Sequence, residues 1–450
     1  MPTSPDSVVP LRTIGIGLVG FGTVGQGVWK HLESQLADLN ARLGIRIDLV
    51  RVAVRDLDKP RAVSVPSGLM TSDPFAVVDD PRVHIVCELM GGTGIARDVT
   101  LRALRSGKVV VSANKALICE HGEAIFRAVR EHGGRFFFEA SVAGGIPIIK
   151  AIREGLVANR FELICGIING TTNYILSRME KEKLPYETIL ADARRLGYVE
   201  ADESLDLDGI DAFHKATILA YLAHGKWVEA DHALVEGIRK VTLEDMGRAR
   251  DFGYRIKLLA VIRRDFRSGW MTLGVYPALL PLDKILARVD GAFNGITLVG
   301  DVVGAQTFVG RGAGQDATAS AVIGDVVDAL IALRDGGAKG MVAADLDFLD
   351  KLGEGVRMAE MDEIVGRFYM RLTLADVAGV LADVYRIFAE ENLSIARVVQ
   401  YEHEGKGTGT VTLSTYETSE LVMERVISKL RALDRVLEEP LLLRIFTPEN

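Results

Sequence analysis

The sequence predicts a protein of several domains that combines α/β and α+β folds, and three observations support this prediction. The chain has 450 residues, enough for about three domains of roughly 150 residues each. An apolar run leads into Gly20-Phe-Gly-Thr-Val-Gly25 and then into a helical pattern, the order expected of a Rossmann-type nucleotide-binding domain. The last roughly eighty residues alternate as strand, helix, strand, strand, helix, strand, which is the ferredoxin-like order.

Composition narrows the class of protein. Hydrophobic residues make up 48% of the chain and charged residues 25%, which is ordinary for a soluble globular protein. The net charge of -8 argues against nonspecific binding to nucleic acid. The cysteines Cys87, Cys119 and Cys165 lack C-x-x-C spacing, so neither a disulfide scaffold nor a zinc site is predicted. No targeting peptide or membrane segment is recognisable, and the sequence therefore predicts a cytoplasmic protein.

The first predicted strand, residues 13–19, ends at the glycine-rich turn, and a helix follows over residues 24–36. Gly20 permits the tight turn, Gly22 lets the backbone approach a pyrophosphate, and Gly25 lets the helix pack on the strand. A glycine turn without a ligand is the alternative. The predicted cofactor contacts in this turn are Gly20, Phe21, Gly22, Thr23, Val24 and Gly25.

The second strand, residues 47–54, ends at a charged turn that bears on cofactor preference. A carboxylate at this point usually binds the ribose of NAD, whereas a basic residue accommodates the 2'-phosphate of NADP. Asp56 and Asp58 would favour NAD, but Arg55 lies nearest the strand end. We therefore predict a preference for NADP. A solvated charged turn without a ligand explains these residues equally well.

Two further strands, residues 83–89 and 109–112, are followed by polar residues that we expect at the cofactor crevice, because ligands collect at the carboxyl ends of parallel strands. These residues are Thr93, Asn114 and Lys115. A short strand, 136–139, precedes the small-residue loop 140–147. This loop could turn carbonyls toward a cation, admit a nicotinamide ring, or do neither. We place the nucleotide domain at 10–147.

The next domain, predicted at 148–311, contains the polar groups of the candidate site. A strand over 160–168 meets Asn169-Gly-Thr-Thr-Asn173, whose side chains could cap a helix, bind a small polar substrate, or do both. The acidic stretch 197–215 follows. It carries Glu200, Asp202, Glu203, Asp206, Asp208 and Asp211 ahead of Lys215.

A helix is predicted over residues 210–224, and it brings Asp211 and Lys215 onto one face, together with apolar residues. Taken alone, this pair could simply stabilise the helix. Strands and turns over 228–309 indicate an antiparallel sheet. The turn Gly310-Arg-Gly-Ala-Gly314 opens a helix, around 312–335, that is expected to complete the nucleotide domain. Residues 336–362 are predicted to be a linker, and 363–450 the ferredoxin-like module.

With these segments in place, the chain resembles homoserine dehydrogenases over nearly its whole length, and its last module resembles an ACT domain. The matching runs are Gly20 to Gly25, Ala113-Asn-Lys-Ala-Leu117, Phe138-Glu-Ala-Ser-Val-Ala-Gly-Gly-Ile-Pro147, Gly166-Ile-Ile-Asn-Gly-Thr-Thr-Asn-Tyr-Ile175, Gly197-Tyr to Lys215, and Gly310 to Gly314. Two positions depart from the family pattern, because Glu203 and Ala378 stand where proline is usual. No aspartate kinase segment precedes the nucleotide domain, which predicts a monofunctional enzyme.

The resemblance implies NAD(P)-dependent interconversion of L-aspartate 4-semialdehyde and L-homoserine, on the route to threonine, methionine and isoleucine. It implies a homodimer or homotetramer, with threonine as an effector at the turn 374–381 of the ACT domain. The implied catalytic residues are Lys215, Lys115 and Asp211; the implied substrate contacts are Glu200, Asp206, Thr171 and Asn173. Gly312 is expected to close over the cofactor. The carbonyls of Glu139, Val142, Gly144 and Ile146 match a loop that binds Na+ or K+.

The chemistry of the reaction agrees with these roles. Hydride reduction of an aldehyde requires a cationic acid near the carbonyl oxygen, which Lys215 would provide. The acidic stretch would bind the ammonium group of the substrate. An aspartate semialdehyde dehydrogenase is rejected because it needs an activated thiolate, and no cysteine lies in an activating setting. Two alternatives are another NAD(P)-dependent oxidoreductase of a small amino acid and a non-catalytic NAD(P)-binding ACT sensor.

Overall fold

The computed structural model of the chain describes residues 11–196, 203–337, 339–403 and 407–448. It divides into two compact units. The first consists of residues up to 157 with 224–226 and 311–354, and the second of 158–223, 227–310 and 355–450. A parallel sheet in the first unit and a mixed sheet in the second confirm the predicted α/β and α+β fold class.

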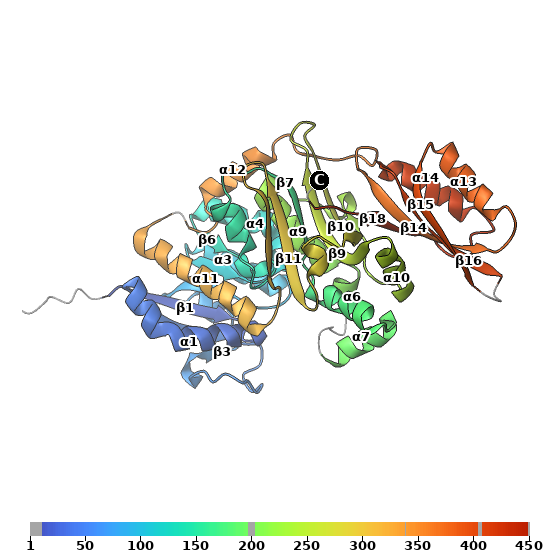
Figure 1. Cartoon of the computed structure of the whole chain (residues 1–450). Helices are drawn as coiled ribbons and strands as arrows, with labels where there is room; N and C mark the ends of the chain where they lie inside the picture. The colour runs from blue at the N-terminus through green and yellow to red at the C-terminus, as the bar shows by residue number, and fades with distance from the viewer. Residues whose placement is uncertain (1–10, 197–202, 338, 404–406, 449–450) are drawn as a thin grey trace, which may run out of the picture. The chain divides into compact units, whose positions relative to one another are not determined.

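The first unit contains a parallel sheet of six strands in the order β3-β2-β1-β4-β5-β6 (Figure 1). Its central strands β1, β4 and β5 are almost continuously buried, as expected when helices cover both faces of a parallel sheet. The strands are β1 (Thr13–Val19), β2 (Arg46–Ala53), β3 (Met70–Thr71), β4 (Val83–Glu88), β5 (Val109–Ser112) and β6 (Arg135–Phe137).

One helix of this unit comes from much later in the chain. Helix α11 (Gln315–Asp335) lies beside α1 (Thr23–Leu43), which the orange and blue ribbons of Figure 1 show. Both helices contribute to one apolar core, in which Trp29 and Leu330 are buried. The other helices of the unit are α2 (Phe75–Val78), α3 (Gly94–Arg105), α4 (Lys115–His132), α5 (Ile148–Lys150) and α12 (Ala343–Gly353).

Helix α12 corrects the prediction that 336–362 is only a linker. It packs against α4, and Arg130 of α4 lies 3.4 Å from Asp347. Leu346 is fully buried. The charged residues of this segment concealed an apolar face that is sufficient to order a helix.

The second unit is built on a mixed sheet with the order β12-β11-β7-β9-β10-β18-β14-β16-β15. Strands β11 and β12 are neighbours in this sheet and are joined by a short turn. The strands are β7 (Phe161–Ile167), β8 (Leu234–Val235), β9 (Tyr254–Arg264), β10 (Trp270–Pro281), β11 (Phe293–Gly300), β12 (Gly304–Arg311), β13 (Arg357–Met358), β14 (Val365–Ala375), β15 (Ile395–His403), β16 (Thr408–Thr415), β17 (Thr418–Ser419) and β18 (Leu441–Ile445).

The helices of this unit include α9, which begins and ends at the predicted residues, Ile210 and His224. Helices α6 and α10 pack against β9. The helices are α6 (Gly170–Glu182), α7 (Tyr186–Arg195), α8 (Ser204–Leu207), α9 (Ile210–His224), α10 (Leu243–Asp251), α13 (Val380–Glu390) and α14 (Glu420–Arg431).

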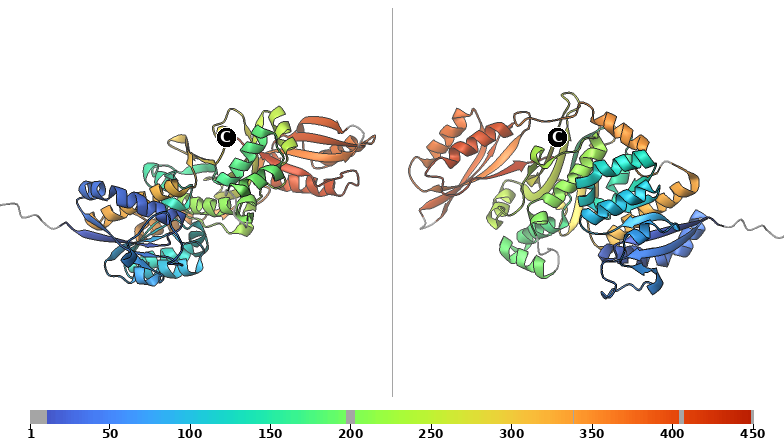
Figure 2. Two further views of the ribbon diagram at one scale, coloured as in Figure 1. Left: turned by 90° about the horizontal axis from the view of Figure 1, so that it is seen from below. Right: turned by 180° about the vertical axis from the view of Figure 1, so that it is seen from behind.

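The ferredoxin-like module has the predicted order β14-α13-β15-β16-α14-β18, and both helices cover one face of its sheet (Figure 2). Its last strand, β18, also pairs in parallel with β10, with Ala278 opposite Arg444. Helix α10 meets the module as well, since Arg371 lies 2.9 Å from the buried Asp245 and Arg248 lies over the ring of Tyr401. The module is therefore continuous with the rest of its unit.

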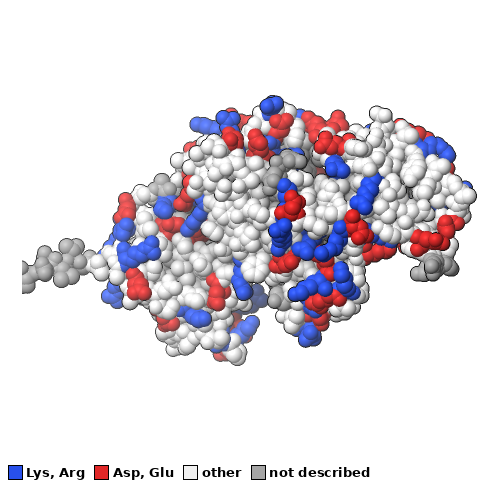
Figure 3. Space-filling view, viewed as in Figure 1, with Lys and Arg blue, Asp and Glu red and all other residues white. Residues whose placement is uncertain are grey.

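Charge is mixed on the surface of the protein. Figure 3 shows basic and acidic side chains interspersed over one face. That face lacks the basic track that a nucleic-acid-binding surface requires. Among the described residues, no helix has the length and apolar character needed to cross a membrane.

Candidate active site

The glycine-rich turn after β1 has the geometry of a pyrophosphate site. Gly20 has φ of +105°, and a Cβ there would lie 2.5 Å from the Leu89 carbonyl oxygen. A Cβ on Gly25 would lie 2.3 Å from the Gly20 carbonyl oxygen. A Cβ on Gly22, by contrast, would meet nothing within 4 Å. Because Gly22 precedes α1 and provides no side-chain cap, the first amides of that helix are open to an anion.

The other predicted cofactor residues occupy different positions around this sheet. Phe21 is buried and packs edge-on against Trp29, with ring centroids 6.2 Å apart, so only its backbone can meet a cofactor. Arg55 is exposed directly beyond β2. Thr93 precedes α3 without a side-chain capping bond.

Lys115 is the first residue of α4, and its neighbour Asn114 fixes the start of that helix. The Asn114 side chain accepts a hydrogen bond from the Leu117 amide at 3.1 Å and donates to the Gly92 carbonyl at 2.7 Å. The loops after β4 and β5 are thereby tied together. Lys115 consequently projects from a fixed point at the carboxyl edge of the sheet.

Glu88 is a buried residue at the same edge of the sheet. The sequence did not single it out as a candidate site residue. Glu88 accepts hydrogen bonds from the Ser112 hydroxyl at 2.7 Å and the Met90 amide at 2.9 Å. Burial raises the pKa of Glu88 to about 7, although these bonds oppose the shift. In the sequence, the signal was a single carboxylate at the end of a mostly apolar strand.

The small-residue loop 140–147 lies against the second glycine turn. Ala143 and Gly144 both have positive φ, 55° and 48°, and a Cβ on Gly144 would lie 2.5 Å from the Gly312 carbonyl oxygen. The Gly145 amide donates to the Arg311 carbonyl at 3.0 Å. Gly312 is therefore held against the loop that the sequence singled out for a cation.

The side chain of Glu139 is hydrogen-bonded to the backbone that directly follows this loop. Its two oxygens accept hydrogen bonds from the amides of Ile149 and Lys150, at 2.9 and 2.8 Å. The Glu139 amide donates to Asp325 of α11 at 2.8 Å. Burial raises the pKa of both carboxyl groups. The carbonyl oxygens of Glu139 and Ile146 each accept one backbone hydrogen bond, and a carbonyl has a second lone pair for another partner.

In the second unit, Asp206 and Asp211 of the acidic stretch form a compact cluster with Asn169. The Asn169 amide nitrogen donates to Asp206 at 2.7 Å and to Asp211 at 2.9 Å. Its oxygen accepts from the Thr172 amide at 2.8 Å and so caps α6. Local helix capping thus fixes the orientation of the group that joins the two carboxylates. The sequence placed Asn169 in the right run but did not assign it this role.

Lys215 lies one helical turn beyond Asp211. Its ammonium group donates to Asp211 at 2.7 Å and to the Ile168 carbonyl at 2.8 Å. Both side chains are nearly buried, with 12% and 9% of their area exposed. An ammonium has three protons, and within the described part of the chain two of them are bonded in this way.

Asp206 completes the anionic part of the cluster. Burial raises its pKa, whereas a hydrogen bond from Asn169 lowers it, the charge of Asp211 raises it, and Lys215 and the Thr171 hydroxyl lower it. Thr171 therefore contacts the cluster through Asp206, and its predicted role as a substrate contact stays a prediction.

Asn173 and Glu200, two of the predicted substrate contacts, are not seen in the cluster. Both amide protons of Asn173 are bonded to the Val289 and Phe293 carbonyls, at 3.0 and 2.9 Å, and its oxygen accepts from the buried Lys257 at 2.9 Å. This corrects the prediction that Asn173 binds substrate, because its amide protons are committed to the fold. Glu200 lies outside the described residues.

Comparison with known proteins gives one consistent family. A model described as homoserine dehydrogenase matches residues 147–327, its NAD-binding domain matches 20–139, and an ACT domain model matches 368–435. A homoserine dehydrogenase of Pseudomonas aeruginosa is 40% identical over 427 residues, covering 95% of this chain and 97% of the relative. One of Neisseria gonorrhoeae is 39% identical over 432 residues, covering 96% and 98%.

The chain belongs to the homoserine dehydrogenase family.

Solved structures agree with this assignment. A homoserine dehydrogenase of Thiobacillus denitrificans has a TM-score of 0.89 at 42% identity, covering 97% of this chain and 99% of that one. A hyperthermophilic archaeal homoserine dehydrogenase solved in complex with NADPH has a TM-score of 0.59 at 25% identity, covering 71% and 98%. The chain is thus an NAD(P)-dependent oxidoreductase with a C-terminal ACT domain.

The cysteines of the chain do not suit the thiolate chemistry that an aspartate semialdehyde dehydrogenase needs. Burial raises the pKa of Cys87 and Cys165 to about 12, and that of Cys119 to about 11. A thiol with such a pKa is protonated at neutral pH and is a poor nucleophile.

Two of the three glycines of the nucleotide turn, Gly22 and Gly25, should respond differently to a methyl group. We expect Gly22→Ala to keep the melting temperature but to weaken NADPH binding by about tenfold, or about 1.4 kcal/mol, because its Cβ enters the space left for the pyrophosphate. We expect Gly25→Ala to lower stability by about 2 kcal/mol. Thermal melting and NADPH fluorescence titration measure the two effects; equal nucleotide affinity in Gly22→Ala and the unaltered protein would contradict the assignment.

Proposed function

We propose that this protein reduces L-aspartate 4-semialdehyde to L-homoserine, and catalyses the reverse oxidation, with NAD(P)H as the hydride donor. The observation that carries this proposal is the Lys215 ammonium held between Asp211 and the Ile168 carbonyl. A cationic acid with a proton to spare, beside an anionic pocket, suits an aldehyde substrate that also bears an ammonium group.

In the reduction, NAD(P)H supplies a hydride to the aldehyde carbon. Lys215 donates its third proton to the carbonyl oxygen, so that the developing alkoxide becomes the alcohol of homoserine, and solvent then returns a proton to the lysine. Asp211 orients Lys215 and stabilises its positive charge. In the oxidation the same steps run in reverse, with Lys215 taking the alcohol proton.

The substrate ammonium would bind to the carboxylates around Asn169. Asp206 and Asp211 provide two negative charges beside one lysine, so the cluster keeps a net negative charge when all three groups are ionised. We assign Glu200 to the same pocket on the family motif, and Thr171 through its bond with Asp206. Asn169 is a positioning residue, because it touches both carboxylates rather than the reacting atoms.

On the cofactor side, we propose a preference for NADP(H), supported by the exposed Arg55 after β2 and by the archaeal relative in complex with NADPH. Lys115 is proposed as a second lysine near the nicotinamide, and Gly312 as part of the cofactor closure. We also propose that a Na+ or K+ ion binds the carbonyls of Glu139, Val142, Gly144 and Ile146. Uncharged oxygen donors suit a hard cation, whose charge would hold this loop against Gly312.

Three further proposals rest on the family and the composition. The protein is a homodimer or homotetramer, which light scattering of the purified protein would test. It works in the cytoplasm, which cell fractionation would test. Threonine binds the ACT domain at the turn 374–381, where Gly379 has φ of +87°, and equilibrium dialysis with labelled threonine would test this.

Replacing Lys215 by methionine should abolish turnover while NADPH still binds with nearly unchanged affinity, because the side chain keeps its bulk but loses its proton. Removal of a general acid costs about 10²- to 10⁴-fold in rate. The measurement is NADPH consumption with aspartate semialdehyde, alongside NADPH titration. Turnover within a factor of ten of the unaltered enzyme would instead favour the non-catalytic sensor or a different oxidoreductase.

Binding of homoserine should weaken as the pH falls. Because burial raises the pKa of Asp206, this group takes up a proton at a higher pH than an ordinary aspartate and then no longer attracts the substrate ammonium. We expect KM for homoserine to rise as the pH falls in the unaltered enzyme, with the rise beginning at a higher pH than an ordinary aspartate would give, and to start high and change little in Asp206→Asn. An Asp206→Asn variant with the same pH profile as the parent would rule out this role.

The proposed cation should affect the rate at constant ionic strength. We expect turnover to fall several-fold when K+ and Na+ are replaced by tetramethylammonium, which is too large for a carbonyl cage, and to recover on addition of either ion. Initial rates in matched chloride buffers measure this. Equal rates in all three buffers would show that the loop works without a cation.

A further inference from the structure

The segment from Glu203 to Asp208 contains Asp206 of the candidate active site. Two arginines form hydrogen bonds with its acidic side chains. Arg194 makes two hydrogen bonds to the Glu203 carboxylate, both at 2.8 Å. Arg239 donates from Nε to Asp208 at 2.6 Å and from Nη1 to Glu203 at 3.3 Å. Arg239 therefore spans the segment and holds both of its ends.

The backbone around Arg239 is fixed to the same segment and to the central sheet. The Ile238 amide donates to the Leu207 carbonyl at 2.9 Å, and the Glu236 amide donates to the Val275 carbonyl of β10 at 2.7 Å. Arg239 thus extends from a stretch of chain that is already anchored. Its guanidinium can restrain Glu203 and Asp208 without first having to be ordered itself.

The strength of the ion pair between Arg239 and Asp208 indicates that Arg239 stabilises this segment rather than the whole protein. Ion pairs with exposed partners contribute little to the stability of a whole protein, and 42% of the Arg239 and Asp208 side chains is exposed. Helix α8 has only four residues, however, and so short an element opens at a small free-energy cost. The contribution of the ion pair is therefore small for the whole protein but large for the segment that presents Asp206.

We infer that Arg239 is a positioning residue, whose bridge between Glu203 and Asp208 holds Asp206 in place for the ammonium group of the substrate. The inference rests on the proposed function for the role of Asp206. The order of the segment itself depends only on the contacts of Arg239.

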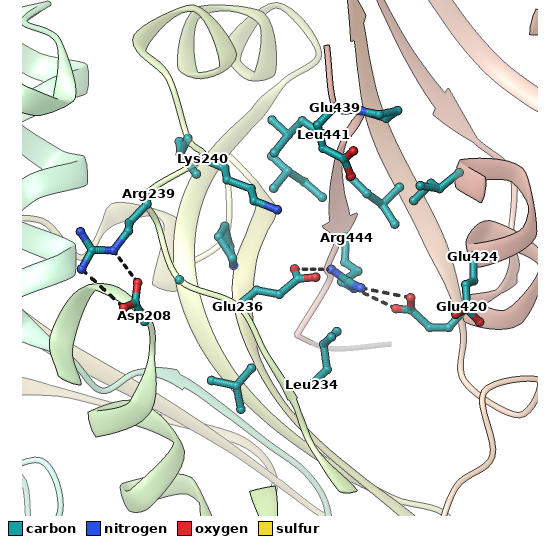
Figure 4. Close-up of a pocket in the computed structure, with 18 of the residues that line it drawn as sticks. Asp208, Leu234, Glu236, Arg239, Lys240, Glu420, Glu424, Glu439, Leu441 and Arg444 are labelled. Carbon is teal, nitrogen blue, oxygen red and sulfur yellow. Dashed lines mark hydrogen bonds and ion pairs between the residues drawn. The ribbon is translucent and has the colours of Figure 1, made fainter. Parts of the chain in front are cut away.

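The bridge also faces a cavity of about 580 Å³ that extends to the ACT domain (Figure 4). Arg239 and Asp208 line one side, and β18 and α14 line the other. In this cavity Arg444 of β18 is bonded to Glu236 at 2.7 Å and to Glu420 at 2.8 Å. Solvent ions can reach Arg239 through the cavity, so the bridge is expected to weaken with salt.

The test uses Arg239→Gln in the full-length enzyme. We expect KM for homoserine to rise about tenfold, KM for NADP+ to stay within twofold, and the melting temperature to stay unchanged. The matched control is Arg250→Gln, which removes another exposed arginine, bonded to Glu180 at 3.2 Å, and should leave both KM values unchanged. Equal changes in the two variants, or a loss of thermal stability together with a general loss of activity, would overturn the inference.

A second variant distinguishes the rigidity of the segment 203–208 from the charge of the bridge that Arg239 forms. Glu203 has φ of -86°, close to the value that proline imposes, so Glu203→Pro should stiffen the segment without the bridge. We expect KM for homoserine to rise less with salt in Glu203→Pro than in the parent, and Arg239→Gln to have a smaller effect in the Glu203→Pro background. Fully additive effects would contradict the bridge.

Hydrogen exchange keeps the inference testable if the enzyme proves inactive on homoserine. We expect the amides of 204–208 to exchange several times faster in Arg239→Gln than in the parent and in Arg250→Gln. Faster exchange without homoserine turnover would refute the proposed function but retain the bridge, whereas unchanged exchange would refute the bridge itself.

Discussion

The cluster of Asp206, Asp211 and Lys215 depends on one amide group, that of Asn169. Two carboxylates beside each other repel, and burial increases the cost of that repulsion. Asn169 donates a hydrogen bond to each of them, while its oxygen is held by the Thr172 amide at the start of α6. The amide cannot rotate without losing the helix cap, so the hydrogen bond that begins α6 also fixes the two carboxylates beside each other.

The sequence reveals the parts of this arrangement that depend on local signals. The helix from 210 to 224 follows from its apolar spacing and the glycine after it, and its periodicity places Asp211 and Lys215 on one face. The nucleotide turn follows from three glycines between an apolar strand and a helix. The ferredoxin-like module follows from the order and spacing of its strands and helices. In each case neighbours in the sequence determine the conformation.

The sequence does not reveal which distant residues meet. Asn169 lies 42 positions before Asp211, and it was one of several polar residues at a helix start. Asn173 has the same chemistry four residues later, yet it points to the Val289 and Phe293 carbonyls and to Lys257. Helix geometry predicts that these two asparagines are near each other, but only the packing of β9 and β11 against α6 determines which one faces the site.

The pairing of β18 with β10 limits how the ACT domain can influence the site. Separating the module would expose the edges of both strands and would leave Asp245, which is 0% exposed, without the charge of Arg371, a change that costs several kcal/mol. Any effect of the module on catalysis must therefore pass through small shifts within one continuous sheet rather than through release of a domain. Glu236, bonded to Arg444 of β18 and three residues before Arg239, lies where such a shift would first reach the segment that carries Asp206.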